Sequence, residues 1–174
     1  MEATDQAGGG RSGVRVVVGG SGRATVSTGL SVLDHLLGRL ALYARFDLTL
    51  ENAPGGADAE VAAAGRAFGE ALAGPLRAEG ARGFGSAAMA ADEALAHVVL
   101  EVSGRPLVCS NVDLSGAHVG GLGSDLAGRF LRELAEGAGL TLHVRLIEGR
   151  DPQHVLEAIF KALGVTLAQA CGPA

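Results

Sequence analysis

The chain has few aromatic residues and little positive charge. It contains 174 residues, of which 3% are aromatic, with no tryptophan, and Lys161 is its only lysine. So few rings argue against stacking on nucleic-acid bases. A net charge of −5 also argues, weakly, against a nucleic-acid surface. We therefore expect no nucleic-acid partner.

Cysteine is scarce as well, and no segment resembles a targeting or membrane sequence. Cys109 and Cys171 have no CxxC partner, which is typical of a reduced, cytoplasmic protein. The N-terminus lacks a basic stretch followed by an apolar core, and no apolar run approaches the length of a membrane span. These absences predict a soluble cytoplasmic protein without a membrane partner.

What is present is typical of one globular domain, with 48% hydrophobic and 19% charged residues. Residues 1–13 are small, polar and glycine-rich, and predict a mobile tail ahead of a single domain over 14–174. In the first half we predict strands at 14–18 and 23–27, paired through the turn at 19–22, a helix at 31–42, a strand at 46–51 and a helix at 61–76. In the second half we predict strands at 94–102 and 107–112, a helix at 125–135, a strand at 140–146 and a helix at 155–170.

The same order of elements thus occurs twice, which indicates an internal duplication with pseudo-repeats of about 14–90 and 91–174. The predicted fold class is α+β, built from two similar βα halves with helices packed on one face of each sheet. Aligning residues 66–69 with 161–164 places Asp58 opposite Gln153, Ala59 opposite His154, and Ala62 opposite Glu157.

The segment 150–163 carries the clearest chemical pattern. His154, Glu157 and Lys161 follow the spacing i, i+3, i+7, so a helix places them along one stripe. An imidazole and a carboxylate three residues apart can hold a divalent metal, and a lysine further along can hold an anion. The alternative is an ordinary solvated face of a helix.

Seven ordered blocks of the sequence are similar to those of the imidazoleglycerol-phosphate dehydratase family. They lie at residues 27–37, 46–50, 84–86, 92–95, 103–106, 138–145 and 154–163. The resemblance implies two similar βα halves and a trimer-based homo-oligomer of up to 24 subunits. It also implies a lyase of histidine biosynthesis that dehydrates imidazoleglycerol phosphate to imidazole acetol phosphate. Two manganese ions would hold the substrate imidazole as an imidazolate, through a His-His-x-x-Glu motif and one further histidine from each half.

Carried over residue by residue, this metal site is incomplete. His35, His143, His154 and Glu157 match family ligands, with Asp58 as a further candidate. Ala59 and Ala62 stand where ligands are expected, and alanine cannot coordinate a metal. Arg105 and Lys161 match the family's phosphate contacts, and Arg82 lies beside Gly83, where another is expected. The family's proton-moving glutamate falls near residues 11–12, where there is no carboxylate, so no catalytic residue is assigned.

Two interpretations follow. One is a dehydratase working with an altered site. The other is a non-catalytic paralogue that keeps the fold as an assembly module or a module that binds a small phosphate-bearing ligand. For single residues the ordinary alternatives are a half-buried His35 bonded by Asp34, and structural or surface roles for His97 and His118. Asp92 and Glu93 belong to a family block without a derived role, and residues 116–123 are interpreted as a flexible loop.

Overall fold

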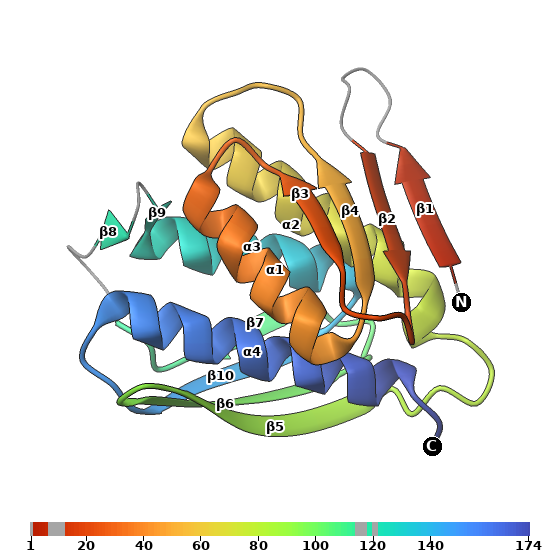
Figure 1. The fold of residues 1–174 in the computed structure, drawn as a ribbon. Coiled ribbons are helices and arrows are strands. Elements are labelled where there is room, and N and C mark those ends of the chain that lie inside the picture. Colours follow the sequence, from red (N-terminus) through yellow and green to blue (C-terminus); the bar gives the residue numbers. More distant parts are fainter. Residues whose placement is uncertain (1, 7–12, 114–117, 120–121) are drawn as a thin grey trace.

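Two four-stranded sheets enclose helices in the computed structural model, which describes residues 2–6, 13–113, 118–119 and 122–174 (Figure 1). The first sheet has the order β1-β2-β4-β3, with β1 at Glu2–Gln6, β2 at Gly13–Val17, β3 at Ala24–Ser27 and β4 at Asp47–Glu51. The second has the order β5-β6-β10-β7, with β5 at Phe84–Ala91, β6 at Ala94–Glu101, β7 at Leu107–Ser110 and β10 at Thr141–Glu148. The helices are α1 at Ser31–Ala44, α2 at Ala57–Leu76, α3 at Ser124–Ala138 and α4 at Pro152–Cys171. A small ribbon joins β8, His118–Val119, to β9, Leu122–Gly123.

Both sheets have the same topology. β1–β2 and β2–β4 are antiparallel while β3–β4 is parallel, and β5–β6, β6–β10 and β7–β10 repeat this pattern. The parallel pairs need a crossover, and α1 and α3 supply it. The prediction of an α+β fold with two similar halves is therefore confirmed.

The predicted hairpin at 14–27 is wrong. β3 pairs with β4 rather than β2, and β7 pairs with β10 rather than β6. In each half the strand after the crossover helix inserts between the two strands that precede it. Leu48 and Leu50 of β4 are buried, as are Leu142 and Val144 of β10. A central position buries these apolar side chains against the helices, which local turn patterns do not reveal.

Two predicted boundaries also change. Residues 84–91 form β5, so the second half begins at Phe84 rather than at residue 91. Residues 2–6 form β1, paired antiparallel with β2, so the prediction of a mobile tail is wrong there. Residues 1 and 7–12 of that tail lie outside the described residues. So do 114–117 and 120–121, which contain part of the predicted loop.

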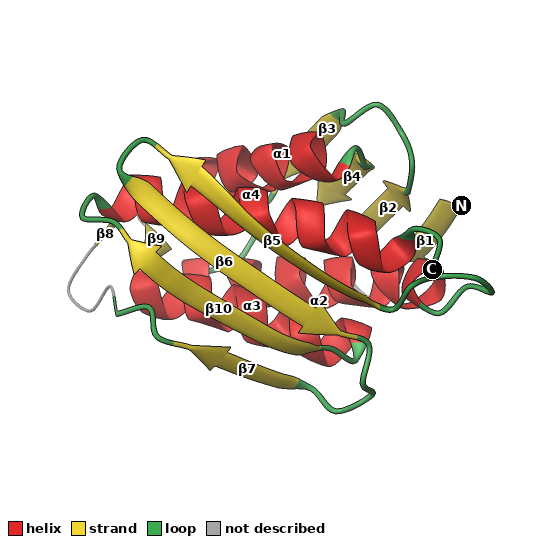
Figure 2. Ribbon diagram, turned by 90° about the horizontal axis from the view of Figure 1, so that it is seen from below, coloured by secondary structure: helices red, strands yellow, loops and turns green. Residues whose placement is uncertain are grey.

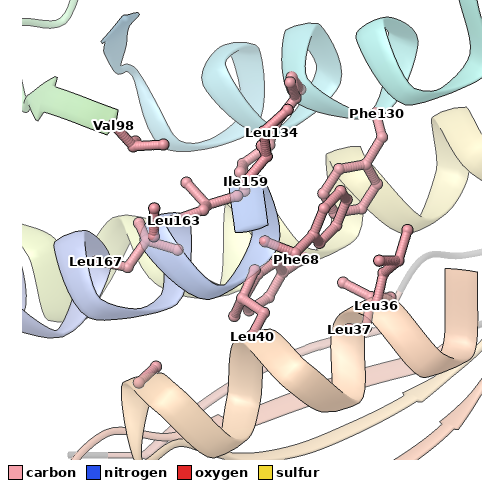
Figure 3. Close-up of a cluster of buried hydrophobic side chains, with 14 of the residues drawn as sticks. Leu36, Leu37, Leu40, Phe68, Val98, Phe130, Leu134, Ile159, Leu163 and Leu167 are labelled. Carbon is pink, nitrogen blue, oxygen red and sulfur yellow. The ribbon is translucent and has the colours of Figure 1, made fainter. Parts of the chain in front are cut away.

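The core lies between the two sheets, where α1 packs on α4 and α2 packs on α3. Seen from below, the second sheet lies across the helices (Figure 2). Leucines of α1, Phe68 of α2, Phe130 of α3 and Ile159 of α4 meet in one buried cluster (Figure 3). The rings of Phe130 and Phe160 lie 5.4 Å apart. Each helix pair therefore joins one half of the chain to the other.

Glycines allow the helix backbones to approach closely at both pairs. A Cβ on Gly69 of α2 would lie 2.5 Å from the carbonyl oxygen of Leu134 in α3. A Cβ on Gly164 of α4 would meet the carbonyl oxygen of Leu40 in α1. The matched use of these two glycines agrees with the predicted alignment of 66–69 with 161–164.

Helix α4 has the length and hydropathy of a membrane span, with a mean hydropathy of 1.2 over its best window. However, 61% of that window is buried inside the structure, where α4 contacts α1, β5 and β6. These contacts make α4 a core helix of the fold, so its apolar character has a structural explanation.

Candidate functional site

The first turn of α4 fixes His154. Asp151 caps the helix by accepting hydrogen bonds from the backbone N–H groups of Gln153, at 2.8 Å, and His154, at 3.4 Å. Pro152 occupies the first turn, where its missing N–H is tolerated. The imidazole of His154 then faces the turn between β5 and β6.

His154 is held between two carboxylates of that turn. Its Nδ1 shares a hydrogen bond of 2.7 Å with Oε2 of Glu93, and its Nε2 lies 3.3 Å from Oδ2 of Asp92. The hydrogen bond to Glu93 raises the pKa of His154, against partial desolvation. Asp92 adopts a positive φ of 49°, which the turn between β5 and β6 requires.

Glu93 connects the turn to α4 by its own contacts. Its Oε1 accepts hydrogen bonds from the backbone N–H of Asp151, at 2.8 Å, and of Arg150, at 3.3 Å. The Asp151 bond, followed by the His154 bond, lowers the pKa of Glu93 to about 2. Glu93 is therefore ionised at neutral pH and attracts the proton of His154.

The other two residues of the stripe have different partners. Oε1 of Glu157 lies 3.2 Å from Nε of Arg39 on α1. Nζ of Lys161 donates to the carbonyl oxygen of Ala90 at 3.2 Å and lies 5.2 Å from the ring centroid of Tyr43. The predicted stripe exists, but each of its side chains is bound by a separate group.

His35 and His143 lie elsewhere. His35 is exposed on α1, on the stripe that also carries Arg39 and Tyr43. The alternative of a half-buried His35 bonded by Asp34 is wrong, because His35 is exposed and Oδ1 of Asp34 instead accepts hydrogen bonds from the N–H of Thr28, at 2.8 Å, and from its hydroxyl, at 2.6 Å.

His143 is exposed on β10 between the buried Leu142 and Val144. Side chains alternate between the faces of a sheet, so His143 points away from the helices. It therefore faces the side of the second sheet opposite to α4, which carries His154.

In the first half, Asp58 on α2 stands at the position that corresponds to Gln153, and it belongs to a set of ion pairs between α2 and α3. Nη1 of Arg129 lies 3.3 Å and 3.2 Å from the two carboxylate oxygens of Asp58. Oε2 of Glu133 lies 3.0 Å from Nε of Arg66, and its Oε1 lies 3.9 Å from Nε of Arg129. Asp58 is thus engaged by an arginine rather than turned towards another metal-ligating side chain.

The three predicted phosphate contacts come from separate elements. The backbone of Arg105 is fixed in the turn after β6, where its N–H donates to Oγ of Ser103 at 3.0 Å and its carbonyl accepts from Oγ1 of Thr141 at 3.1 Å. Its side chain is exposed. The guanidinium of Arg82 lies 4.3 Å from the ring centroid of Phe84, and Lys161 is on α4.

The donor set of a single chain does not fit a manganese centre. Within residues 2–6, 13–113, 118–119 and 122–174, no three His, Cys, Asp or Glu side chains are arranged so that together they could hold one metal ion. Both cysteines are unpaired and half-buried, and burial raises the pKa of the Cys171 thiol to about 12. A thiol that is protonated at neutral pH is a poor ligand.

Several partners in this region were missed at the level of sequence. Arg39 pairs with Glu157, and Arg129 and Glu133 form ion pairs between α2 and α3. Glu93, which had no derived role, is hydrogen-bonded to His154. Arg39 lies four residues after His35, a spacing that puts both on one helix face, but no local pattern indicates α4 as its partner. His97 is bonded to Oγ of Ser86 at 2.7 Å on the second sheet, consistent with its predicted structural or surface role.

Comparisons with known proteins give the same family as the sequence resemblance. The family model described as imidazoleglycerol-phosphate dehydratase matches residues 28–167. The chain is similar to the dehydratase of Syntrophobacter fumaroxidans, with 39% identity over 160 residues, or 89% of this chain and 81% of that protein. It is also similar to the chloroplastic dehydratase of Pisum sativum, with 37% identity covering 90% of this chain and 57% of that protein.

Among solved structures, the dehydratase of Staphylococcus aureus has a TM-score of 0.88 at 28% identity, covering 100% of this chain and 99% of that one. The Pyrococcus furiosus protein has a TM-score of 0.84 at 28% identity, with coverage of 98% and 94%. The similarity therefore extends over both halves of the fold.

Proposed function

The chain belongs to the imidazoleglycerol-phosphate dehydratase family, and from that premise we propose that it serves histidine biosynthesis as a divergent, non-catalytic member. It keeps the fold, and we propose that it acts as an assembly module that binds a small phosphate-bearing ligand. The family reaction, dehydration of imidazoleglycerol phosphate to imidazole acetol phosphate, is not sustained by this chain alone.

The chemistry of that reaction supports the proposal. An imidazolate is unstable near neutral pH unless Lewis acids bind its nitrogens. His35, His143, His154 and Glu157 remain from the eight family ligands that the resemblance implies, while Ala59 and Ala62 cannot coordinate. Loss of a single group supporting a metal ligand typically costs about 10–100-fold in affinity or activity. Several ligands are replaced together here.

One observation carries the proposal: the carboxylates at the metal positions are paired with arginines. Glu157 is paired with Arg39 at 3.2 Å, and Asp58 with Arg129 at 3.2 Å. A carboxylate must leave its guanidinium before it can bind a metal ion. The remaining donors therefore start from a state that disfavours manganese.

The proposed partners follow from the surface. Arg105, Arg82 and Lys161 each carry a cationic group of the kind that binds phosphate, and by family resemblance they supply phosphate contacts. The second sheet exposes Phe84, Val99, Leu107 and Ile147, an apolar set that suits a homo-oligomer, and by family resemblance this is trimer-based with up to 24 subunits. Two unpaired cysteines fit a cytoplasmic location.

A second function is favoured by the contacts of His154. A carboxylate bonded to Nδ1 fixes the orientation of the ring, as it does for many metal-ligating histidines. On this view the chain retains dehydratase activity with an altered manganese site that uses His35, His143, His154 and Glu157.

The test is rescue of a histidine auxotroph that lacks the dehydratase, together with turnover by the purified protein. The matched control is a family member with both His-His-x-x-Glu motifs intact, expressed at the same level. We expect rescue by the control and neither rescue nor turnover by this chain. Rescue at a rate comparable with the control would reject the non-catalytic proposal in favour of the dehydratase.

A further inference from the structure

The two helix pairs are related by the internal duplication, so their positions can be compared directly. The buried residues Leu36 and Leu40 of α1 correspond to Phe130 and Leu134 of α3. Aligned on these positions, His35 corresponds to Arg129. On the same basis Arg39 corresponds to Glu133, and the alignment of α2 with α4 matches Asp58 with Gln153, Ala62 with Glu157, and Arg66 with Lys161.

Ion pairs form at some of these positions in both interfaces, although between different pairs of positions. The α1–α4 interface has Arg39 with Glu157, and the α2–α3 interface has Asp58 with Arg129 and Glu133 with Arg66. Because α1 and α2 belong to the first half while α3 and α4 belong to the second, every one of these pairs crosses between halves. At the one equivalent position that is ion-paired in both interfaces the charge is reversed, because Arg39 stands in α1 where Glu133 stands in α3.

The Arg39–Glu157 pair is the more enclosed at the carboxylate. The side chain of Glu157 is 18% exposed, whereas that of Asp58 is 64% exposed. Nε of Arg39 is buried and lies 3.2 Å from Oε1 of Glu157, yet it makes no geometrically acceptable hydrogen bond. The distance supports an ion pair, whereas the angle does not support a hydrogen bond. Arg39 therefore acts on Glu157 as a nearby positive charge.

The Arg39–Glu157 pair differs from the metal site that the family resemblance implies. We propose that Arg39 is a tethered cation, a positive charge fixed to the chain, which neutralises Glu157 where the resemblance implies a metal ion. In the other interface Arg129 neutralises Asp58, which also stands where the resemblance implies a ligand. Two implied ligand positions thereby join the two halves through ion pairs. This inference concerns stability and cation binding, so it goes beyond the proposed function and does not depend on turnover.

The test replaces the tethered cation by a free one. Arg39→Met removes the charge while keeping an apolar stem against α4. The uncompensated Glu157 should lower the thermal midpoint of the full-length protein by about 1–4 °C, the range for a partly exposed ion pair in a chain of this size. Adding manganese or magnesium chloride in the millimolar range should restore most of that loss, because a divalent ion can then pair with Glu157.

Four controls make the result specific. The wild-type midpoint should not respond to either salt, nor should that of Arg132→Met, which alters an exposed arginine of α3. The double variant Arg39→Met with Glu157→Gln should recover stability relative to Arg39→Met and should lose the response to the divalent ion. Potassium chloride at equal ionic strength separates a bound ion from general screening.

The inference is overturned if the wild-type protein gains stability from manganese to the same degree as Arg39→Met. It is equally overturned if Arg39→Met matches Arg132→Met, or if its loss is not restored by a divalent ion. A histidine auxotroph rescued by the wild-type chain would reject the proposed function without touching these outcomes, so the two failures can be told apart.

Discussion

Replacing Gly69 by alanine tests how closely the two halves of the chain are joined. Gly69 lies on α2 where that helix crosses α3. The new methyl group would lie 2.5 Å from the carbonyl oxygen of Leu134, 3.0 Å from N of Ala138 and 3.1 Å from Cα of Gly137. All three contacts are backbone atoms, which cannot rotate away as a flexible side chain would.

The magnitude follows from two opposing effects. An alanine in a helix interior is intrinsically favoured over glycine by about 1 kcal/mol. Overpacking a rigid contact costs about 1–3 kcal/mol, and occasionally more. Three contacts well below ordinary van der Waals separation put Gly69→Ala at the upper end of that range, so a net loss of about 1–2 kcal/mol is expected. For a chain of this size that loss lowers the thermal midpoint by about 2–8 °C.

The assay is thermal and urea unfolding of Gly69→Ala beside Gly38→Ala. Gly38 lies inside α1, and a Cβ there would meet no atom within 4 Å. Gly38→Ala should therefore leave the midpoint unchanged or raise it by a few degrees, because only the helix preference operates. Equal effects of the two substitutions would refute the close approach of α2 and α3.

Two further predictions concern the core and the contacts that hold His154 between Asp92 and Glu93. Phe160→Ala, fully buried, should lose about 3–5 kcal/mol in urea unfolding, whereas Phe84→Ala, whose residue is 51% exposed, should change the unfolding free energy far less. The raised pKa of His154 gives stability that is complete below 6.5 and is lost as pH rises through the folded value. The pKa of Glu93, lowered from 4.5 to about 2, gives stability that is complete above 4.5 and is lost as pH falls towards 2. The difference in thermal midpoint between wild type and His154→Gln should therefore be largest between pH 4.5 and 6.5. A difference independent of pH would contradict the stabilising hydrogen bond between His154 and Glu93.

The helices could be predicted from sequence because their apolar spacing is local. On α1 the side chains that face the protein core follow the helical spacing; they are Leu33, Leu36, Leu37 and Leu40. Strand order could not be predicted in the same way. β4 and β10 insert between earlier strands, and this pairing depends on where α1 and α3 pack rather than on turn residues. β5 was missed because small residues such as Ser86, Ala88 and Ala90 give little strand signal.

The candidate site shows the same division. The stripe of His154, Glu157 and Lys161 follows from spacing within one helix. Its partners do not, because Glu93 lies 61 residues from His154 in sequence and Arg39 belongs to the other half of the chain. The duplication located the equivalent positions in α2, but it could not indicate that Arg129 would pair with Asp58.

The central claim is that Asp58 and Glu157, which stand where the family resemblance implies manganese ligands, are paired with arginines instead. Its most direct test is elemental analysis of the purified full-length protein, saturated with manganese and then dialysed, beside a family member with both His-His-x-x-Glu motifs intact. The account predicts that the control retains its metal while this chain retains far less than about one ion per subunit. Retention of about one or more ions per subunit by this chain would contradict it.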